Sequence, residues 1–311
     1  MSELINIREY PVRDVLGLLL KDKTTKQNII WATDAYASRG AAFSDKSQIT
    51  KTALLGMEAV ELQPRIEKAL SEQQARTRKK AEVFTPVWLC NQMNNDCDEQ
   101  WFGRRDVFNI ECSNHQWDVI EAKVQFPEGT TWQKYVDSRR LEITCGEAPY
   151  LVSRYDAATG ELILPPFRRI GILDRKLRIV NENADTEEEW IKWATRAFQA
   201  SYGYEYQGDS LLIARINLLM TFCDYYGERW EKQADVKLLK SIANIISWNL
   251  WQMDGLKDTV PLGKPYEEFH QQTLFEVMEL EDRTDEAVAL PCRIFNWRSN
   301  ESLLFKNCKE M

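Results

Sequence analysis

Residues 202–225 read YGYEYQGDSLLIARINLLMTFCDY, and this stretch decides the fold class. Its first part, residues 202–206, alternates aromatic residues with small or acidic ones, as a short β-strand does. From residue 210 to 225 the apolar spacing predicts a helix, and Asp209 at its start suits the positive end of the helix dipole. A strand that passes directly into a helix is the repeating unit of α/β proteins.

Strands and helices of the same kind lie on both sides of this unit. Upstream, residues 141–144 predict a strand and residues 187–200 an amphipathic helix. Downstream, residues 234–246 predict a helix and residues 247–253 a strand. The alternation favours an α/β layered fold with a mainly parallel sheet. Ligands of such sheets bind where the carboxyl ends of the strands meet, so the loops after the strands are the candidate site.

The N-terminal part predicts a helix at 12–20, a strand at 28–32 and a helix-like run at 63–80. The last run ends in a cluster of basic side chains: Arg76, Arg78, Lys79 and Lys80. Such a cluster is either a solvated helix end or a contact for phosphate groups.

The composition is that of an ordinary globular chain. Of its 311 residues, 44% are hydrophobic and 28% charged, with a net charge of -8. The negative charge argues against a protein that coats nucleic acid by electrostatics alone, so any DNA contact has to be local or come from a partner. Seven widely spaced cysteines, no signal peptide and no membrane-spanning apolar stretch lead us to expect a cytoplasmic protein without a disulfide framework.

Three loops that follow the predicted strands carry residues suited to an adenosine-containing ligand. Gly146 lets the backbone approach a ligand closely, and Glu142 before it can pair with an amino group. Glu205, at the end of the second strand, can accept both ribose hydroxyls. Asp254, after the third strand, can accept from an adenine amino group. Each also has an ordinary interpretation, with Gly146 and Asp254 as turn formers and Glu205 as a surface acid.

Four segments resemble adenine-N6 DNA methyltransferases of restriction systems. Residues 81–86, AEVFTP, look like the segment that opens their S-adenosylmethionine (SAM) site, and residues 141–151, LEITCGEAPYL, resemble their glycine loop. Residues 202–219 are similar to their ribose-binding strand and following helix, and residues 249–256, NLWQMDGL, to their Q-x-D-x-L strand end. The order is that of the family. The likeness is greatest to a group labelled restriction endonuclease subunit M and covers most of residues 10–262.

The resemblance implies a Rossmann-like SAM-dependent methyltransferase fold, with a mainly parallel sheet, flanking helices, and N-terminal and C-terminal extensions. Residues 1–80 would form the first extension, residues 81–262 the methyltransferase-like domain with an insertion at about 155–187, and residues 263–311 the C-terminal tail. The implied SAM-binding residues are Phe84, Thr85 and Pro86 flanking the SAM, Glu142 and Gly146 at its methionine part, Glu205 at the ribose and Asp254 at the adenine.

The resemblance also implies a function, namely a DNA adenine-N6 methyltransferase-like protein of a restriction-modification or phage-defence system. Its partners would be DNA and a specificity or other operon-encoded subunit. The family's Asn/Asp-Pro-Pro-Tyr/Phe box, which accepts from the amino group of a flipped base and stacks on its ring, is absent after Asp254. The catalytic residues are therefore unassigned.

Two further departures concern the glycine loop and the C-terminal part. Residues 147–149, Glu-Ala-Pro, replace the small residues of the family's loop, and Glu147 would place a negative charge near the SAM carboxylate. After Pro261 too few residues follow for a target-recognition domain. Three explanations stay open: a partner subunit completes the site, the protein binds SAM without catalysis as a regulatory or structural subunit, or the box has an unrecognised form.

A nuclease is one alternative. Asp106 or Asp118 with Glu121 and Lys123 looks like a D…E-x-K arrangement, in which two carboxylates hold a divalent metal. Asp118 is too close to Glu121 to precede it on a separate strand, which favours a solvated edge instead.

Hydrolase and zinc chemistry have less support. The two histidines, His115 and His270, lie in polar contexts away from any G-x-S-x-G turn. Cys90 and Cys97 are the nearest approach to a paired zinc ligand, and their spacing is too wide. We therefore expect no metal site.

Overall fold

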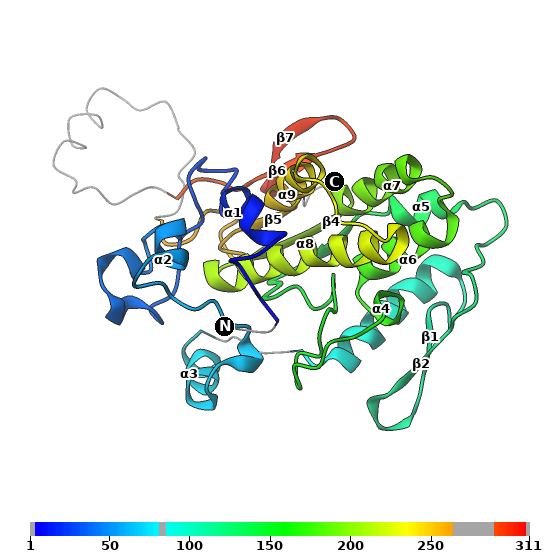
Figure 1. Cartoon of the computed structure of the whole chain (residues 1–311), viewed down its shortest axis with the longest axis horizontal. Coiled ribbons are helices and arrows are strands. Elements are labelled where there is room, and N and C mark those ends of the chain that lie inside the picture. The colour runs from blue at the N-terminus through cyan, green and yellow to red at the C-terminus, as the bar shows by residue number, and fades with distance from the viewer. Residues whose placement is uncertain (1–3, 81–84, 264–288, 309–311) are drawn as a thin grey trace.

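The predicted strand-to-helix unit is the centre of the fold. It forms β4 (Ser201–Glu205) and α8 (Gly208–Trp230), which confirms the element types read from the sequence. Every residue of α8 from 208 to 219 is buried, so neighbouring elements surround its first half on all sides. The computed structural model shown in Figure 1 describes three stretches of the chain: residues 4–80, 85–263 and 289–308.

A parallel sheet of three strands runs through the molecule. β3 (Arg140–Glu142) and β5 (Leu250–Gln252) pair with β4 on either side, in the order β3-β4-β5. The crossovers between parallel neighbours are helical, with α6 (Ile172–Asn183) and α7 (Glu187–Gln199) before β4, and α8 and α9 (Val236–Asn249) before β5. The chain is thus a mixed α/β protein with a small parallel sheet, as expected.

The two faces of this sheet are covered differently. Because the strands follow each other in sequence order, right-handed crossovers place their helices on the same face. The opposite face packs against the antiparallel hairpin of β6 (Arg293–Asn296) and β7 (Glu301–Leu304). A separate apolar cluster lies there, built mostly from residues in or next to the strands and the hairpin: Tyr202, Tyr204, Trp251, Met253, Val260, Cys292, Ile294 and Phe305.

The N-terminal residues share the main core. α1 (Val12–Leu19) packs against α8 and α9, and one continuous apolar cluster extends from Leu4 to Leu250. α2 (Lys51–Leu55) and α3 (Leu70–Lys80) follow. Short 3-10 helices occur at Ala37–Arg39, Ala41–Phe43, Arg65–Glu67, Ser113–His115, Pro166–Arg168 and Phe305–Cys308.

The strand predicted at residues 28–32 is wrong. This segment forms only isolated β-bridges, because its backbone groups bond to several separate parts of the chain and not to one neighbouring strand. The N–H of Ile30 donates to Gln252 Oε1 at 2.9 Å, and Gly208 donates its N–H to the carbonyl oxygen of Trp31. A Cβ on Gly208 would lie 1.9 Å from the carbonyl oxygen of Ile30. Glycine is therefore required where this segment crosses the start of α8.

Two helices and an antiparallel strand pair cover the side of the molecule next to α6. They are α4 (Val87–Phe102), the antiparallel pair β1 (Asn109–Glu111) and β2 (Trp117–Val119), and α5 (Trp132–Val136). Buried Arg175 of α6 donates to Asp98 of α4 at 2.5 Å, which fixes α4 to the helical layer.

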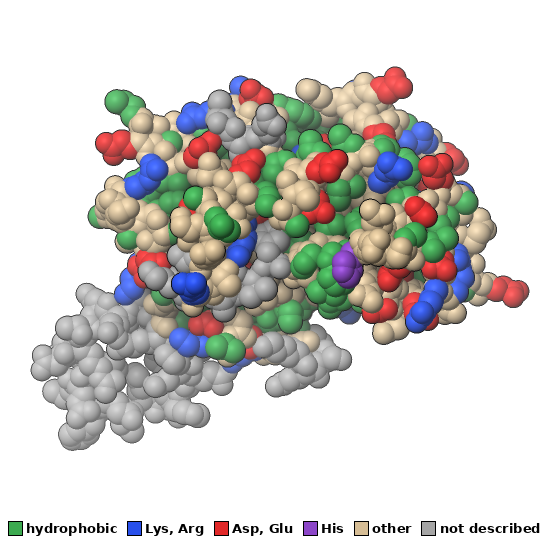
Figure 2. Space-filling model, turned by 90° about the horizontal axis from the view of Figure 1, so that it is seen from below, with side chains coloured by type: hydrophobic (Ala, Val, Ile, Leu, Met, Phe, Trp, Pro, Cys, Tyr) green, Lys and Arg blue, Asp and Glu red, His purple; other side chains and the backbone are tan. Residues whose placement is uncertain are grey.

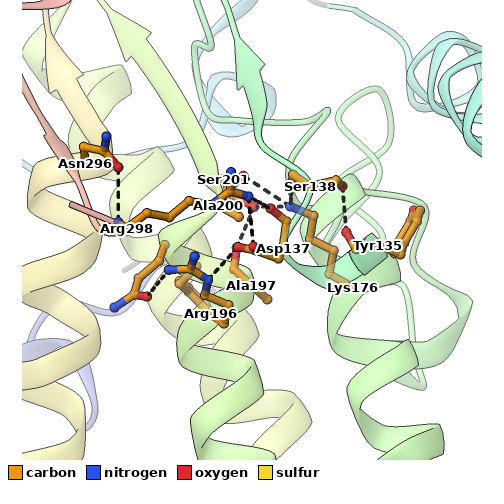
Figure 3. A network of polar contacts seen from close by, with 12 residues as sticks. Tyr135, Asp137, Ser138, Lys176, Arg196, Ala197, Ala200, Ser201, Asn296 and Arg298 are labelled. Carbon is orange, nitrogen blue, oxygen red and sulfur yellow. Dashed lines mark hydrogen bonds and ion pairs between the residues drawn. The ribbon is translucent and has the colours of Figure 1, made fainter. Parts of the chain in front are cut away.

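A buried lysine holds the amino end of the sheet. Lys176 Nζ donates to the carbonyl oxygens of Ser138 (2.6 Å) and Ala200 (3.2 Å), just before β3 and β4 (Figure 3). Burial lowers the pKa of Lys176 well below its usual value. These contacts fix the strand ends that lie opposite the candidate site. Within the described ranges, no helix has the length and apolar character needed to cross a bilayer.

Candidate functional site

The carboxyl ends of β3, β4 and β5 meet at one edge of the sheet, and the loops after them form the candidate site. Gly146 donates its backbone N–H to Glu205 Oε2 at 2.9 Å, and the N–H of Gln207 donates to Glu205 Oε1 at 3.0 Å. Glu205 is 8% exposed, so it is not a surface acid. The fold thus brings together two residues, Gly146 and Glu205, that the sequence singles out.

The loop after β3 has a backbone that favours glycine. Thr144, Gly146 and Ala148 have φ values of 46°, 54° and 65°. Residues other than glycine rarely adopt these φ values, so the backbone at Thr144 and Ala148 is strained. Strain of this kind is found most often at ligand-binding sites. At Gly146, its chain neighbours aside, no atom of the described residues lies within 4 Å of the position of a Cβ. The backbone at Gly146 is therefore open to close approach.

Glu142, the last residue of β3, is buried and has a shifted pKa. Its carboxyl group accepts the backbone N–H groups of Tyr150 (3.3 Å) and Leu151 (3.0 Å), which closes the loop back onto the strand. Burial raises the pKa of Glu142 to about 8, the two N–H groups oppose the rise, and Glu205 adds to it. Because Glu142 pairs with Gly203 and side chains alternate, Glu142 and Glu205 lie on the same face of the sheet.

We expect the free energy of unfolding to fall as pH rises from about 4.5 to about 8, owing to Glu142. An unfolded chain loses this proton near pH 4.5, whereas the folded protein keeps it to about pH 8. Between these two pH values the folded state binds more protons than the unfolded state. The stabilisation by Glu142 is therefore complete below about pH 4.5 and is lost as the pH rises through about 8. Glu142→Gln should remove the contribution of Glu142 to this pH dependence, which urea unfolding at about pH 4.5 and at about pH 8 measures. An unchanged slope would show that Glu142 does not titrate as described.

The Thr85–Pro86 segment lies beside the glycine loop. Pro86, with ψ of 146°, is the N-cap of α4, one residue later than the N-cap position expected at Thr85. Cys90 Sγ donates to the carbonyl oxygen of Thr85 at 3.9 Å. Burial raises the pKa of Cys90 to about 12, and the charge of Glu142 adds to the rise. The charge of Glu142 acts on Cys90, so the segment lies near the end of β3, whereas Phe84 lies outside the described residues.

The surface near this segment carries an aromatic stack. The rings of Trp88 and His115 lie 3.9 Å apart between centroids, at an interplanar angle of 22°. His115 is exposed. Hydrophobic side chains also reach the surface near the centre of the face that Figure 2 shows. The first turn of α4 therefore presents an aromatic surface next to Thr85 and Pro86.

Asp254 follows β5 at the same edge, and its contacts are those of a turn former. Oδ1 accepts the backbone N–H of Leu256 at 3.1 Å, and Oδ2 lies 3.6 Å from Lys257 Nζ. Next to it, the N–H of Met253 donates to the carbonyl oxygen of Glu205 at 2.9 Å. Asp254 thus lies one strand over from Glu205, with a partly exposed carboxylate.

The sequence led us to expect the charge of Glu147 at the surface of the glycine loop, and the structure does not place it there. Its carboxylate accepts the backbone N–H of Arg65 (2.7 Å) and the hydroxyl of Tyr155 (2.7 Å), and the residue is 7% exposed. Asn217 of α8 donates to the Glu147 carbonyl oxygen at 3.2 Å. The substituted loop is therefore fastened to the N-terminal segment and to α8.

A buried ionic cluster at the start of α8 was not predicted from the sequence. Asp209 accepts from Arg76 at 2.9 Å, Lys68 Nζ at 3.3 Å and the hydroxyl of Tyr36 at 2.9 Å. Arg76 also donates to Gln207 at 3.0 Å. Burial opposes ionisation of Asp209, but Lys68 and Arg76 outweigh it and hold its pKa well below the usual value. The cluster fastens α3 beside the residues that follow β4.

This cluster corrects the prediction for the basic end of α3. Arg76 is 4% exposed, so it is neither solvated nor available to phosphate. Arg78 is exposed, while the side chains of Lys79 and Lys80 lie outside the described part. A charge pattern along a helix does not reveal a distant buried carboxylate such as Asp209. Asp209, the acid in the first turn of α8, was the signal available in the sequence.

The residues of the nuclease alternative lie away from the parallel sheet. Asp106, Asp118, Glu121 and Lys123 are all exposed, on or near the β1–β2 pair. Within the placed residues, no three His, Cys, Asp or Glu side chains gather in a metal-binding arrangement. The geometry gives this alternative no support.

Comparison with known proteins does not identify a family. No family model, no curated protein and no solved structure matches the chain. The assignment of function depends on the residues at the carboxyl edge of the sheet.

Proposed function

We propose that the carboxyl edge of β3, β4 and β5 binds SAM, in a Rossmann-like methyltransferase fold of a restriction-modification or phage-defence protein. The observation that carries the proposal is the meeting of Gly146 and Glu205. A left-handed glycine bordered by open space donates at 2.9 Å to the acid that ends the neighbouring strand. A glycine loop after one parallel strand and an acid at the end of the next are the elements with which α/β folds hold adenosine-containing ligands.

Each residue would bind a different part of SAM. The open backbone at Gly146 would receive the methionine end. Its ammonium group would lower the pKa of the buried Glu142 and pair with the carboxylate that forms when the proton leaves. Glu205 would accept the ribose hydroxyls, and Asp254 the adenine amino group, with residues 85–86 at the flank. SAM would supply the methyl group, and the part of this chain is to bind and orient it.

Glu205→Gln is expected to weaken SAM binding by about 10- to 100-fold, because hydrogen bonds to a charged acceptor contribute about 1.5–3 kcal/mol. The amide keeps an acceptor for Gly146 or for Gln207 but turns its own NH2 donor toward the other N–H, so the thermal midpoint should fall by several degrees, and SAM binding is measured well below it. Titration calorimetry with SAM measures the effect. Glu188→Gln, the same change at an exposed position of α7, is the matched control and should bind like the parent. Equal affinity of the Glu205 and Glu188 variants would remove the ribose assignment.

The transfer step requires a base-binding box, and the sequence contains none in a recognisable form. We therefore assign recognition of the target adenine to a partner subunit, with DNA as the substrate of the assembled enzyme. The same absence supports a second function, that of a SAM-binding regulatory or structural subunit.

Labelled SAM and DNA distinguish these functions. Methyl transfer only when the operon-encoded partner is added supports the shared enzyme. Transfer by the chain alone contradicts it and indicates an unrecognised box. SAM binding without transfer in either mixture supports the regulatory subunit.

A further inference from the structure

Two backbone groups hold the carboxylate of Glu205. Gly146 donates its N–H to Oε2 at 2.9 Å, and the N–H of Gln207 donates to Oε1 at 3.0 Å. Gly146 belongs to the loop after β3, whereas Gln207 belongs to the turn between β4 and α8. The direction of the carboxylate therefore depends on where the backbone of Gln207 lies.

A side chain from α3 fixes Gln207. Nη2 of Arg76 donates to Gln207 Oε1 at 3.0 Å, and the two residues are 4% and 5% exposed. The same guanidinium donates to both carboxylate oxygens of Asp209, from Nη1 at 2.9 Å and from Nη2 at 3.2 Å. A guanidinium is a rigid planar fork, so the pairing with Asp209 also sets the position from which Arg76 reaches Gln207. One buried side chain thus holds the turn after β4 to α3.

The contact from α3 adds to one from β5 and leads to a second part of the proposed site. Gln252 Nε2 donates to the carbonyl oxygen of Tyr206 at 2.8 Å, which holds the turn from the side of β5. The helix α3 ends at Lys80, shortly before residues 85–86, the segment that we place at the flank of SAM. Arg76 therefore joins the helix that leads to this flank with the acid that we place at the ribose.

We propose that Arg76 is a positioning residue of the SAM site, which acts through Gln207 to hold the Glu205 carboxylate where it accepts the ribose hydroxyls. The inference rests on the proposed function and adds α3 to the site. Hydrogen bonds weaken steeply as their angle changes, so a carboxylate that meets two neighbouring hydroxyls depends on the groups that support it. A carboxylate that is held before SAM arrives also lowers the entropy cost of binding.

Gln207→Met tests the contact and leaves the ion pairs in place. Methionine has a similar length and volume but offers Arg76 only a weak acceptor, and Asp209 keeps both of its bonds to the guanidinium. We expect the affinity for SAM to fall by about 3- to 10-fold, within the coupling that residues of one hydrogen-bond network show. Titration calorimetry well below the thermal midpoint of each variant measures the change.

A double-variant cycle separates positioning from a merely structural role. In a protein that already carries Glu205→Gln, the further change Gln207→Met should alter the affinity for SAM by less than about twofold, because the acid that Gln207 positions is gone. A loss of the same size in both backgrounds would overturn the proposal. Gln199→Met is the matched control and should bind like the parent, since Gln199 also accepts from an arginine, Arg196, at 3.2 Å, but lies just before β4, at the opposite end of that strand.

Arg76→Lys tests the arginine itself. Lysine keeps a cation for Asp209 but cannot serve Asp209 and Gln207 with one planar fork. We expect the affinity for SAM to fall by the same factor as in Gln207→Met, and the protein with both changes to show no further loss. An Arg76→Lys variant that binds SAM like the parent would contradict the role of Arg76. A parent protein that does not bind SAM would instead contradict the proposed function, and this inference with it.

Discussion

Replacing Asp209 with asparagine is expected to lower the free energy of unfolding by about 3–5 kcal/mol, the usual cost of removing one partner of a buried ion pair. The Lys68 and Arg76 groups that surround Asp209 are 3% and 4% exposed on their side chains, and Asp209 is fully buried. Without the carboxylate, two cations lose their shared partner in a place that water does not reach. Urea unfolding near neutral pH measures the loss, and the thermal midpoint should fall by on the order of 10 °C.

The pH dependence of this effect has a definite sign. The pKa of Asp209 is lowered in the folded protein, so its stabilisation is present above the unfolded value of about 4 and is lost as pH falls through the folded one. The difference in the free energy of unfolding between the parent and Asp209→Asn should therefore decrease only in strong acid. Asp185→Asn, at an exposed position, is the matched control and should change little. A loss below about 1 kcal/mol at neutral pH would show that the cluster does not hold α3 in place.

Arg215→Met should have an effect of similar size, about 3–5 kcal/mol, by a different mechanism. Arg215 is fully buried, and burial lowers its pKa to about 10. Its guanidinium donates to the carbonyl oxygens of Leu19 (2.5 Å), Lys21 (2.9 Å) and Leu250 (2.6 Å). Methionine fills a similar volume but leaves these oxygens without a donor. The end of α1 and the start of β5 would lose their connection to α8.

Two controls accompany this variant in urea unfolding. Arg215→Lys retains a cation that reaches part of the carbonyl set, so its loss should be intermediate. Arg13→Met removes an arginine whose side chain is 63% exposed and should change the free energy of unfolding by less than about 0.5 kcal/mol. If all three variants were equally stable, the carbonyl contacts of Arg215 would have no structural role.

The elements of the central sheet could be predicted because their signals are local. Alternation over residues 202–206 predicts a strand that the structure places at 201–205, and the apolar spacing of α8 is likewise read from adjacent residues. The segment at 28–32 has the composition of a strand, but its backbone bonds are divided among Leu20, residues 45–49, a side chain from residue 252 and the glycine at 208, so no continuous ladder forms. Contacts so distant in the chain leave no local pattern.

The candidate site divides in the same way. Glycine and acid positions at strand ends can be read from spacing, and the structure brings Gly146 and Glu205 into contact. The burial of Glu142 and the partners of Asp209 could not be predicted from the sequence, because both depend on packing between distant segments. Asp209 and its partners Arg76 and Lys68 are more than 130 positions apart. Asp254 lies at the expected edge, with contacts that a turn also explains.

A structure of the protein with SAM tests the central claim most directly. The account predicts SAM at the carboxyl edge of β3, β4 and β5, with its methionine end at Gly146 and its ribose hydroxyls on the Glu205 carboxylate. The loop around Gly146 should keep its backbone conformation when SAM binds, because the backbone at Gly146 is already accessible to a ligand. SAM bound elsewhere on the protein, or no SAM bound at millimolar concentration, would contradict the account.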